Sequence, residues 1–373
     1  MSKRAYIGID DIARKIKKGY IGIDGVARKI KKAYIGIGGI ARPFWSSSEI
    51  EYYGTISGPS KDIYYMSATH IGNYALFAGG KNSSNTYINT VYAYNTSLVR
   101  STPTALSEAR EYISSTHIGN YALFAGGKNS NTISVNIIDI YDTSLTQTTI
   151  QLTSSDYGRC RFAGTCNDNY AIFCGGVTFS NSTNGDVIAF DINFTRRVIS
   201  NIMVVRDLSA THVSGYALFA GGSSQTSVPQ QMTCAFNTSL TVTYPSHLSE
   251  RKYRFAATHI EKYAVFGGGV GSSAVTNTVD VFNESLSKIN VSNLSIARES
   301  LAATHVDEYA VFGGGTNGSR NYSTVDVYDT SLVRRSLQNL SAGRSTLSAT
   351  HVSNYAIFGA GDGSPAVDVY TVT

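Results

Sequence analysis

The chain has 373 residues, of which 42% are hydrophobic but only 15% are charged, against an ordinary charged share of about 25%. Glycine (35) and tyrosine (25) are abundant and proline (6) is scarce, which favours many short strands joined by polar turns over helices. No run of about eighteen apolar residues is present, so we expect no membrane insertion. The N-terminus lacks the apolar segment of a signal peptide, so we expect synthesis in the cytoplasm without secretion.

The basic character is concentrated at the N-terminus. Residues 1–42 contain eleven Lys or Arg and three Asp, whereas the rest of the chain contains twenty Lys or Arg and twenty-three Asp or Glu. A unit of fourteen residues repeats here with Tyr6, Tyr20 and Tyr34 in register. Each unit places Tyr-Ile-Gly-Ile before a short polar pair (Asp-Asp, Asp-Gly or Gly-Gly) that suits a two-residue hairpin turn. We therefore predict three tandem hairpins over residues 1–43, whose tyrosines contact a partner or a second copy, because a lone hairpin is marginally stable.

A longer repeat occupies residues 44–373. The motif Ala-Thr-His-x-x-x-Tyr-Ala-x-Phe-x-Gly-Gly occurs in seven copies at spacings of 46–49 residues, with small departures. Anchored on the histidine position, the copies lie at His70, His117, Cys166, His212, His259, His305 and His351. Each copy predicts four strands, and a four-stranded unit of this size buries both faces only when such units stack around an axis. We therefore predict an all-β fold, a seven-bladed β-propeller.

The ends of the repeat predict how the ring closes. The last copy stops after its third strand, while residues 51–57 (EYYGTIS) precede the first copy at the place of a fourth strand. We expect this N-terminal strand to complete the last blade, because closure pairs edges that an open sheet would expose.

Three features of the long repeat resemble kelch repeats. The first is the glycine doublet after the second strand, as in Gly79-Gly80. The second is an aromatic residue ending the third strand: Tyr94, Tyr141, Phe190, Phe236, Phe282, Tyr328 and Tyr370. The third is an arginine near the start of the next copy: Arg110, Arg159, Arg206, Arg298 and Arg344. The resemblance implies a kelch-like propeller and leaves function open, because propellers host many activities.

The N-terminal units resemble the YIGxGGxARKxKK repeats at the starts of proteins encoded in phages and prophages of Firmicutes, often near tail genes. That resemblance implies a virion-associated role in a tail fibre or baseplate. It also implies that the arm contacts other virion or tail proteins, with homo-oligomers as a further possibility.

The sequence contains no nucleophile elbow, HExxH motif or Walker loop in its proper context. We therefore expect no catalytic residues, no cofactor and no enzyme activity. The repeat histidines fall one to a blade, which we expect to be too wide a ring for a metal site, since zinc ligands lie about 2.0–2.3 Å from one ion. Each imidazole is expected to bind a neighbouring blade or a turn carbonyl instead. The four cysteines form no CxxC pair and are expected to be buried reduced thiols; one disulfide is the alternative, because Cys160, Cys166 and Cys174 lie within fifteen residues of each other.

The loops after the glycine doublets differ most between copies, and a propeller presents them on one face. Their Asn, Ser, Thr and Tyr residues suit hydroxyl-rich ligands such as glycans as well as protein contacts. The predicted ligand-binding residues are Tyr87, Phe179, Asn184, Gln225, Arg320 and Tyr322. The sequence thus predicts a non-enzymatic phage tail protein, located in the virion, whose propeller recognises a host surface glycan or a partner protein. The alternative is a cytoplasmic kelch adaptor whose basic arm binds nucleic acid or another polyanion.

Overall fold

The computed structural model describes residues 49–373, apart from 60–61, 132–133, 153–157 and 201, and the backbone of six strands before them. Every regular element in these described residues is a β-strand, and none of them forms a helix that could cross a membrane. The chain divides into two compact units, Met1–Glu51 with Val372–Thr373 and Tyr52–Thr371.

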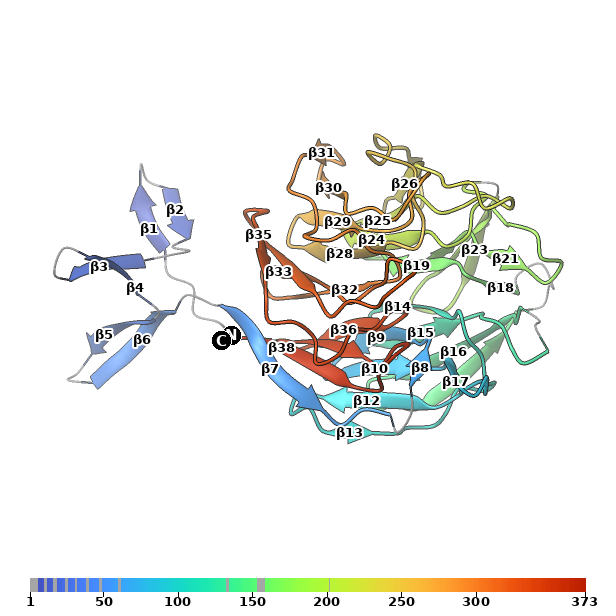
Figure 1. Cartoon of the computed structure of the whole chain (residues 1–373), viewed down its shortest axis with the longest axis horizontal. Helices are drawn as coiled ribbons and strands as arrows, with labels where there is room; N and C mark the ends of the chain where they lie inside the picture. The colour runs from blue at the N-terminus through green and yellow to red at the C-terminus, as the bar shows by residue number, and fades with distance from the viewer. Residues whose placement is uncertain are drawn as a thin grey trace. The chain divides into compact units, whose positions relative to one another are not determined.

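Within the described part of the second unit, seven four-stranded antiparallel sheets form the blades of a propeller (Figure 1). Blades 1 to 3 are β9 (Ser67–Ile71), β10 (Tyr74–Ala78), β12 (Val91–Asn95) and β13 (Arg100–Ser101); β14 (Ser114–Ile118), β15 (Tyr121–Ala125), β16 (Ile137–Asp142) and β17 (Gln147–Gln151); and β19 (Ala163–Cys166), β20 (Ala171–Cys174), β22 (Val187–Phe190) and β23 (Arg196–Ile199). Blades 4 and 5 are β24 (Ser209–Val213), β25 (Tyr216–Ala220), β26 (Thr233–Phe236) and β27 (Val242–Thr243); and β28 (Ala256–Ile260), β29 (Tyr263–Gly267), β30 (Val279–Asn283) and β31 (Lys288–Ile289). Blades 6 and 7 are β32 (Ala302–Val306), β33 (Tyr309–Gly313), β34 (Val325–Asp329) and β35 (Arg334–Ser336); and β36 (Ser348–Val352), β37 (Tyr355–Gly359), β38 (Val367–Val372) and β7 (Ile50–Ile56).

Burial explains the residue types along each blade. The second strand is buried along almost its whole length, as in β10 and β37, because neighbouring blades cover both of its faces. Its phenylalanine packs edge to face on the aromatic residue that ends the third strand, as Phe77 does on Tyr94 at 5.8 Å between ring centroids. Fourth strands such as β23 are mostly exposed, so they form the outer edge of the propeller.

The N-terminal strand closes the ring, as the sequence predicts. In Figure 1 the blue β7 lies beside the red β38, and the sheet order β36-β37-β38-β7 completes blade 7. The Tyr52 hydroxyl donates to Asp368 Oδ1 at 2.6 Å, and the Tyr94 hydroxyl of blade 1 donates to the Ser57 carbonyl at 2.8 Å. These bonds join the first residues of the propeller to both its last and its first blade.

Four blades contain an ion pair whose side chains are completely buried. The pairs are Arg110–Asp139 at 2.7 Å, Lys252–Asp280 at 2.9 Å, Arg298–Asp326 at 3.0 Å and Arg344–Asp368 at 2.7 Å. Each basic residue lies seven positions before the histidine position of its copy. In blade 4 this place holds Val205, and the acid is replaced by Cys234, both buried. Arg206 is therefore one residue out of register, contrary to the kelch-based assignment, and its Nη2 donates to Ser227 Oγ at 2.9 Å.

The tight turn between third and fourth strands is held by an Asn or Asp side chain. Asn95 Oδ1, for example, accepts the backbone N–H groups of Ser97 and Val99 at 3.0 and 2.9 Å. Asn237 and Asn283 make the same bonds. Among the described residues the four cysteines are free and buried, as expected from the sequence.

The first unit contains three two-stranded antiparallel sheets in the described part of the arm. They are β1 (Tyr6–Ile9) with β2 (Ile12–Lys15), β3 (Gly19–Ile23) with β4 (Val26–Ile30), and β5 (Lys32–Ile37) with β6 (Ile40–Ser46). Tyr6 pairs with Lys15, Tyr20 with Lys29 and Tyr34 with Pro43, so the tandem register predicted from the sequence is present. The two-residue turns predicted at residues 10–11, 24–25 and 38–39 lie outside the described residues.

Candidate ligand-binding funnel

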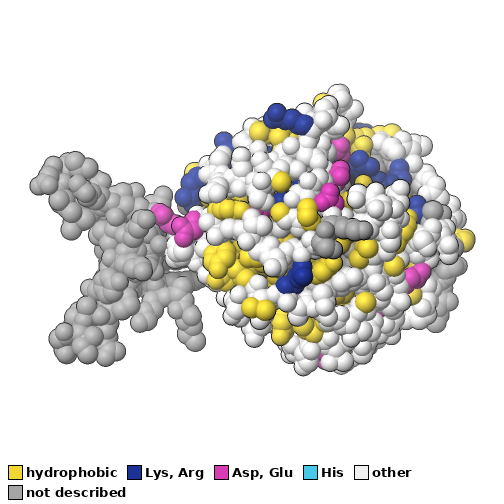
Figure 2. All heavy atoms as spheres, turned by 60° about the horizontal axis from the view of Figure 1, so that its bottom comes forward, with side chains coloured by type: hydrophobic (Ala, Val, Ile, Leu, Met, Phe, Trp, Pro, Cys, Tyr) yellow, Lys and Arg dark blue, Asp and Glu magenta, His cyan; other side chains and the backbone are white. Residues whose placement is uncertain are grey.

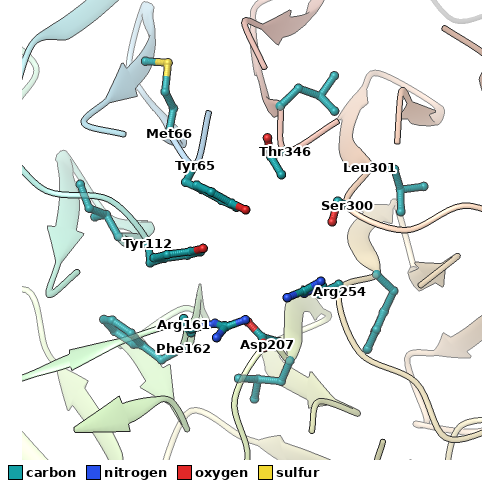
Figure 3. Close-up of a pocket in the computed structure, with 14 residues that line it drawn as sticks. Tyr65, Met66, Tyr112, Arg161, Phe162, Asp207, Arg254, Ser300, Leu301 and Thr346 are labelled. Atoms are coloured by element: carbon teal, nitrogen blue, oxygen red, sulfur yellow. The ribbon is translucent and has the colours of Figure 1, made fainter. Parts of the chain in front are cut away.

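One residue of each repeat lines a cavity where the seven blades meet. It lies five positions before the histidine position, just ahead of the inner strand. These residues are Tyr65, Tyr112, Arg161, Asp207, Arg254, Ser300 and Thr346. With the apolar residue that follows each of them, they line a cavity of about 250 Å³ (Figure 3). We call this cavity the axial funnel and the seven residues its ring residues.

The ring residues are connected from blade to blade through their backbones. The N–H of Asp207 donates to the carbonyl of Arg161 at 2.9 Å, and the N–H of Arg254 donates to the carbonyl of Asp207 at 3.0 Å. The same bond recurs between Ser300 and Arg254, Thr346 and Ser300, and Arg161 and Tyr112, and it joins Tyr65 of blade 1 to Thr346 of blade 7 at 3.2 Å. Backbone hydrogen bonds thus join six of the seven neighbouring pairs of ring residues at the mouth of the funnel.

All seven ring residues adopt a left-handed backbone conformation, with φ between 51° and 59°. Glycine adopts this region freely, whereas a residue with a Cβ atom is strained there. None of the seven is glycine, and Thr346 is β-branched. Such strain persists only where the surrounding structure imposes it, and it clusters at binding and catalytic sites. The turns before the fourth strands adopt the same conformation, as at Leu98 and Phe194, so it is a feature of the repeat backbone and by itself assigns no role to these side chains.

The chemistry of the ring residues contrasts with the uniformity of the strands behind them. The inner strands are near copies of Ser-Ala-Thr-His. The ring position, in contrast, holds an aromatic, cationic, anionic or hydroxyl side chain, depending on the blade. A position that varies among five residue types inside a near-identical repeat suits specific recognition of a ligand.

One side of the funnel is aromatic and charged. The rings of Tyr65 and Tyr112 lie 4.3 Å apart at 36°, and the Arg161 guanidinium lies over the Tyr112 ring at 5.3 Å. Arg161 Nε also donates to Asp207 Oδ1 at 2.8 Å. Burial raises the pKa of Tyr112, helped by its hydrogen bond with Tyr65, so its hydroxyl remains protonated at neutral pH.

The other side of the funnel is more open. The Arg254 side chain is 43% exposed, and its Nη1 lies 3.3 Å from Glu299 Oε2. The hydroxyls of Ser300 and Thr346 complete the ring (Figure 3). The funnel thus offers flat aromatic surface, a guanidinium donor and several hydroxyls within one cavity.

The variable loops surround the funnel on the same face. In each blade the residue before the ring position pairs with the first residue after the glycine doublet. The pairing forms short strands in two blades, β8 (Ile63–Tyr64) with β11 (Lys81–Asn82), and β18 (Arg159–Cys160) with β21 (Val177–Thr178). In the other blades it is a single bridge, as between Glu111 and Lys128. The loops predicted to bind ligand therefore begin at the funnel rim.

The structure places three of the predicted ligand-binding residues in contacts that organise the loops. The Tyr87 hydroxyl donates to Glu111 Oε1 at 3.3 Å, at the rim beside Tyr112. Gln225 joins the loops of blades 3 and 4, because its Nε2 donates to the Asn181 carbonyl at 2.6 Å and its Oε1 accepts the Thr183 N–H. Asn184 Oδ1 accepts the N–H of Asp186.

The other three predicted residues differ in exposure. Phe179 is 60% exposed, whereas Tyr322 is buried with the Arg320 guanidinium 4.7 Å from its ring centroid. The six residues belong to four blades, and none of them lines the axial funnel. Their role in ligand binding remains a prediction.

The repeat histidines lie much closer together than the sequence suggested. Neighbouring imidazole centroids are 3.8–4.2 Å apart from His212 through His259, His305, His351 and His70 to His117. The expectation of a wide ring was wrong, because the inner strands approach the axis closely. Imidazoles of neighbouring blades touch through their rings, whereas the bond that each was expected to make to a neighbouring blade or a turn carbonyl stays a prediction, apart from the contact of His117 Nε2 with Cys166 Sγ at 3.7 Å. Among the described residues no group of three His, Cys, Asp or Glu has metal-binding geometry.

Comparison with known proteins supports the fold and nothing finer. No protein-family model matches the sequence, and no curated protein matches it. A solved structure described as "Structure of YjhT" is similar with a TM-score of 0.59 and 11% sequence identity, over 76% of this chain and 99% of that one. In all, 528 solved chains match, which fits a widely used fold. At this identity the likeness shows the β-propeller alone.

Proposed function

We propose that the chain is a non-enzymatic binding protein whose kelch-like propeller recognises a host surface glycan through the axial funnel. The observation that carries the proposal is the convergence of seven chemically varied side chains, one from each blade, on one cavity of about 250 Å³. Sites for drug-sized ligands span about 300–1,000 Å³. A single terminal sugar unit therefore suits the funnel better than an extended chain.

The chemistry of the ring residues supports a polyhydroxyl ligand. Tyr65 and Tyr112 offer aromatic faces and hydroxyls, and the exposed guanidinium of Arg254 offers donors. Asp207 and Ser300 add acceptors around the same cavity. A sugar presents an apolar face and several hydroxyls, so it uses both kinds of group at once. The loops at the rim would contact neighbouring sugar units.

The second part of the proposal concerns the arm. We propose that it anchors the propeller in a phage tail fibre or baseplate, so that the protein resides in the virion with other tail proteins as partners. The three paired-strand units support this, since an isolated two-stranded hairpin is only marginally stable in water and needs a packing partner. The partner is another virion protein or a second copy of the arm.

A basic arm also fits the alternative of an adaptor that binds a polyanion. On the propeller face in Figure 2, Lys and Arg side chains form separate small groups rather than one continuous basic surface. The propeller residues include twenty Lys or Arg and twenty-three Asp or Glu, so polyanion binding would depend on the eleven basic residues of the arm. The salt dependence of binding distinguishes a polyanion-binding arm from an arm that packs on a protein partner. Polyanion affinity falls steeply with salt, whereas an arm that packs by apolar contacts keeps its multimer at high salt.

The test of the glycan proposal is a binding screen of the full chain against bacterial surface glycans. Arg254→Ala and Tyr112→Ala should each weaken binding at least about tenfold, which corresponds to about 1.4 kcal/mol. The matched control is Tyr244→Ala, which removes an exposed tyrosine outside both the funnel and the variable loops and should keep the affinity. The result that overturns the proposal is binding unchanged in both funnel variants but lost in Phe179→Ser, which changes an exposed loop residue outside the funnel.

A further inference from the structure

A stack of imidazoles lies where the seven inner strands meet. Neighbouring rings are inclined at 44–54° with centroids 3.8–4.2 Å apart, and the stack crosses the closure of the propeller between His351 and His70. Cys166 takes the seventh place, with its Sγ 3.7 Å from His117 Nε2. We call these six histidines the histidine ring. In each copy the histidine position follows the ring residue of the funnel by five positions in the sequence.

No opposite charge is built into this stack. The inner and second strands of the blades carry no Asp, Glu, Lys or Arg in the part of the chain that the structure describes. Their other titratable groups are cysteines and the tyrosines that begin second strands. Charged residues occur in the turns after the inner strands: Asp168, Glu261, Lys262, Asp307 and Glu308. Of these, Asp168 lines a cavity of about 310 Å³ with His117 and His212.

We propose that the histidine ring is an acid-sensitive latch, which holds together the six inner strands that carry the histidines while the imidazoles are neutral and releases them when they are protonated. Neutral imidazoles stack across every blade boundary except the two beside Cys166. Protonation would place like charges about 4 Å apart in a half-buried setting, with no carboxylate among the strands to compensate them.

The direction of the pH dependence follows from burial. Burial lowers the pKa of all six imidazoles, to about 4 in His117, His212 and His351. In the unfolded chain a histidine titrates near its ordinary pKa of about 6.5. Between these values the unfolded chain binds protons that the folded ring does not. Stability is therefore complete above about pH 6.5 and falls steeply as the pH decreases toward 4.

The experiment is an acid titration of the full chain, followed by near-ultraviolet circular dichroism. We expect a cooperative loss of native signal between about pH 5 and 6, because six groups act together on an ordinary folding stability. The double substitution His259→Gln with His305→Gln should lower the midpoint by about half a pH unit, since two of the six groups no longer take up protons. The matched control is His247→Gln, which changes the exposed histidine outside the ring and should leave the midpoint unchanged.

Two further measurements keep the test decisive if the double variant does not fold. His305→Cys introduces the residue that the chain itself has at position 166, and should lower the midpoint by about a quarter of a pH unit. Proton NMR of the unaltered protein should show the ring imidazoles neutral at a pH just above the transition, about pH 6. Ring imidazoles that titrate near pH 6.5 in the folded protein, or an acid midpoint below pH 4, would overturn the proposal. So would an equal shift with His247→Gln.

Discussion

Replacing Arg110 by valine should destabilise the propeller by about 3 kcal/mol, the lower end of the 3–5 kcal/mol range for breaking a buried ion pair. Arg110 Nη2 lies 2.7 Å from Asp139 Oδ2, and neither side chain is exposed. The substitution leaves the Asp139 carboxylate buried without a cation. The lower end applies because Gln147 Nε2 still donates to Asp139 Oδ1 at 2.6 Å.

A double variant that should restore stability can be copied from blade 4 of the same chain. Blade 4 folds with Val205 and Cys234 at the positions of the arginine and the aspartate. Arg110→Val combined with Asp139→Cys therefore reproduces an arrangement that the repeat already accommodates. Removing both charges avoids the isolated carboxylate, so most of the lost stability should return, to within about 1.5 kcal/mol of the unaltered protein. The remainder is the cost of the Gly126 carbonyl, which loses the Arg110 Nε donor at 2.7 Å.

Urea unfolding measures both effects, provided that the slope of free energy against urea is unchanged between variants. The reasoning is refuted if the double variant is as unstable as Arg110→Val. That result would mean that the damage comes from the lost contacts of the arginine and not from the buried, unpaired carboxylate.

Three further predictions concern closure, strain and thiols. Tyr52→Phe removes the hydroxyl that donates to Asp368 at 2.6 Å, so urea unfolding should show a loss of about 1.5 kcal/mol; no loss would mean that this bond does not help to close blade 7. Thr346→Gly relieves a β-branched residue at φ 51°, so stability should rise by about 1 kcal/mol while glycan affinity falls; a fall in stability would contradict the strain argument. Burial raises the pKa of the Cys160 thiol, and it raises the pKa of the Cys166 thiol to about 11. Neither thiol should therefore react quickly with a disulfide reagent at pH 8 in the native protein. Fast reaction at either thiol would show that the inner strands open readily.

The repeat spacing was enough to predict the strands, the blade number and the strand that closes blade 7. These follow from one local rule, since a unit with two apolar faces needs neighbours on both sides. The arginine assignment failed at Arg206 because it followed residue type, whereas distance from the histidine position selects Val205. Counting from that position also identifies Lys252, which replaces the arginine in the buried ion pair of blade 5.

The funnel and the histidine ring could not be read from the sequence in the same way. The ring residues share the histidine spacing, but five residue types at seven positions leave no motif to search for. The signal that could have found them is variation at one fixed offset beside a uniform strand, as at Asp207 and Ser300. The closeness of the imidazoles depends on how near the inner strands come to the axis, which spacing along the chain does not contain.

The most direct test of the central claim is the position of a bound sugar. Host surface glycan fragments added to the full chain can be located by transferred NMR effects or by a structure of the complex. The account predicts a terminal sugar in the axial funnel, stacked on Tyr65 or Tyr112 and within hydrogen-bond distance of Arg254. A sugar bound only at the outer loops around Phe179, with the funnel unoccupied at saturation, would contradict it.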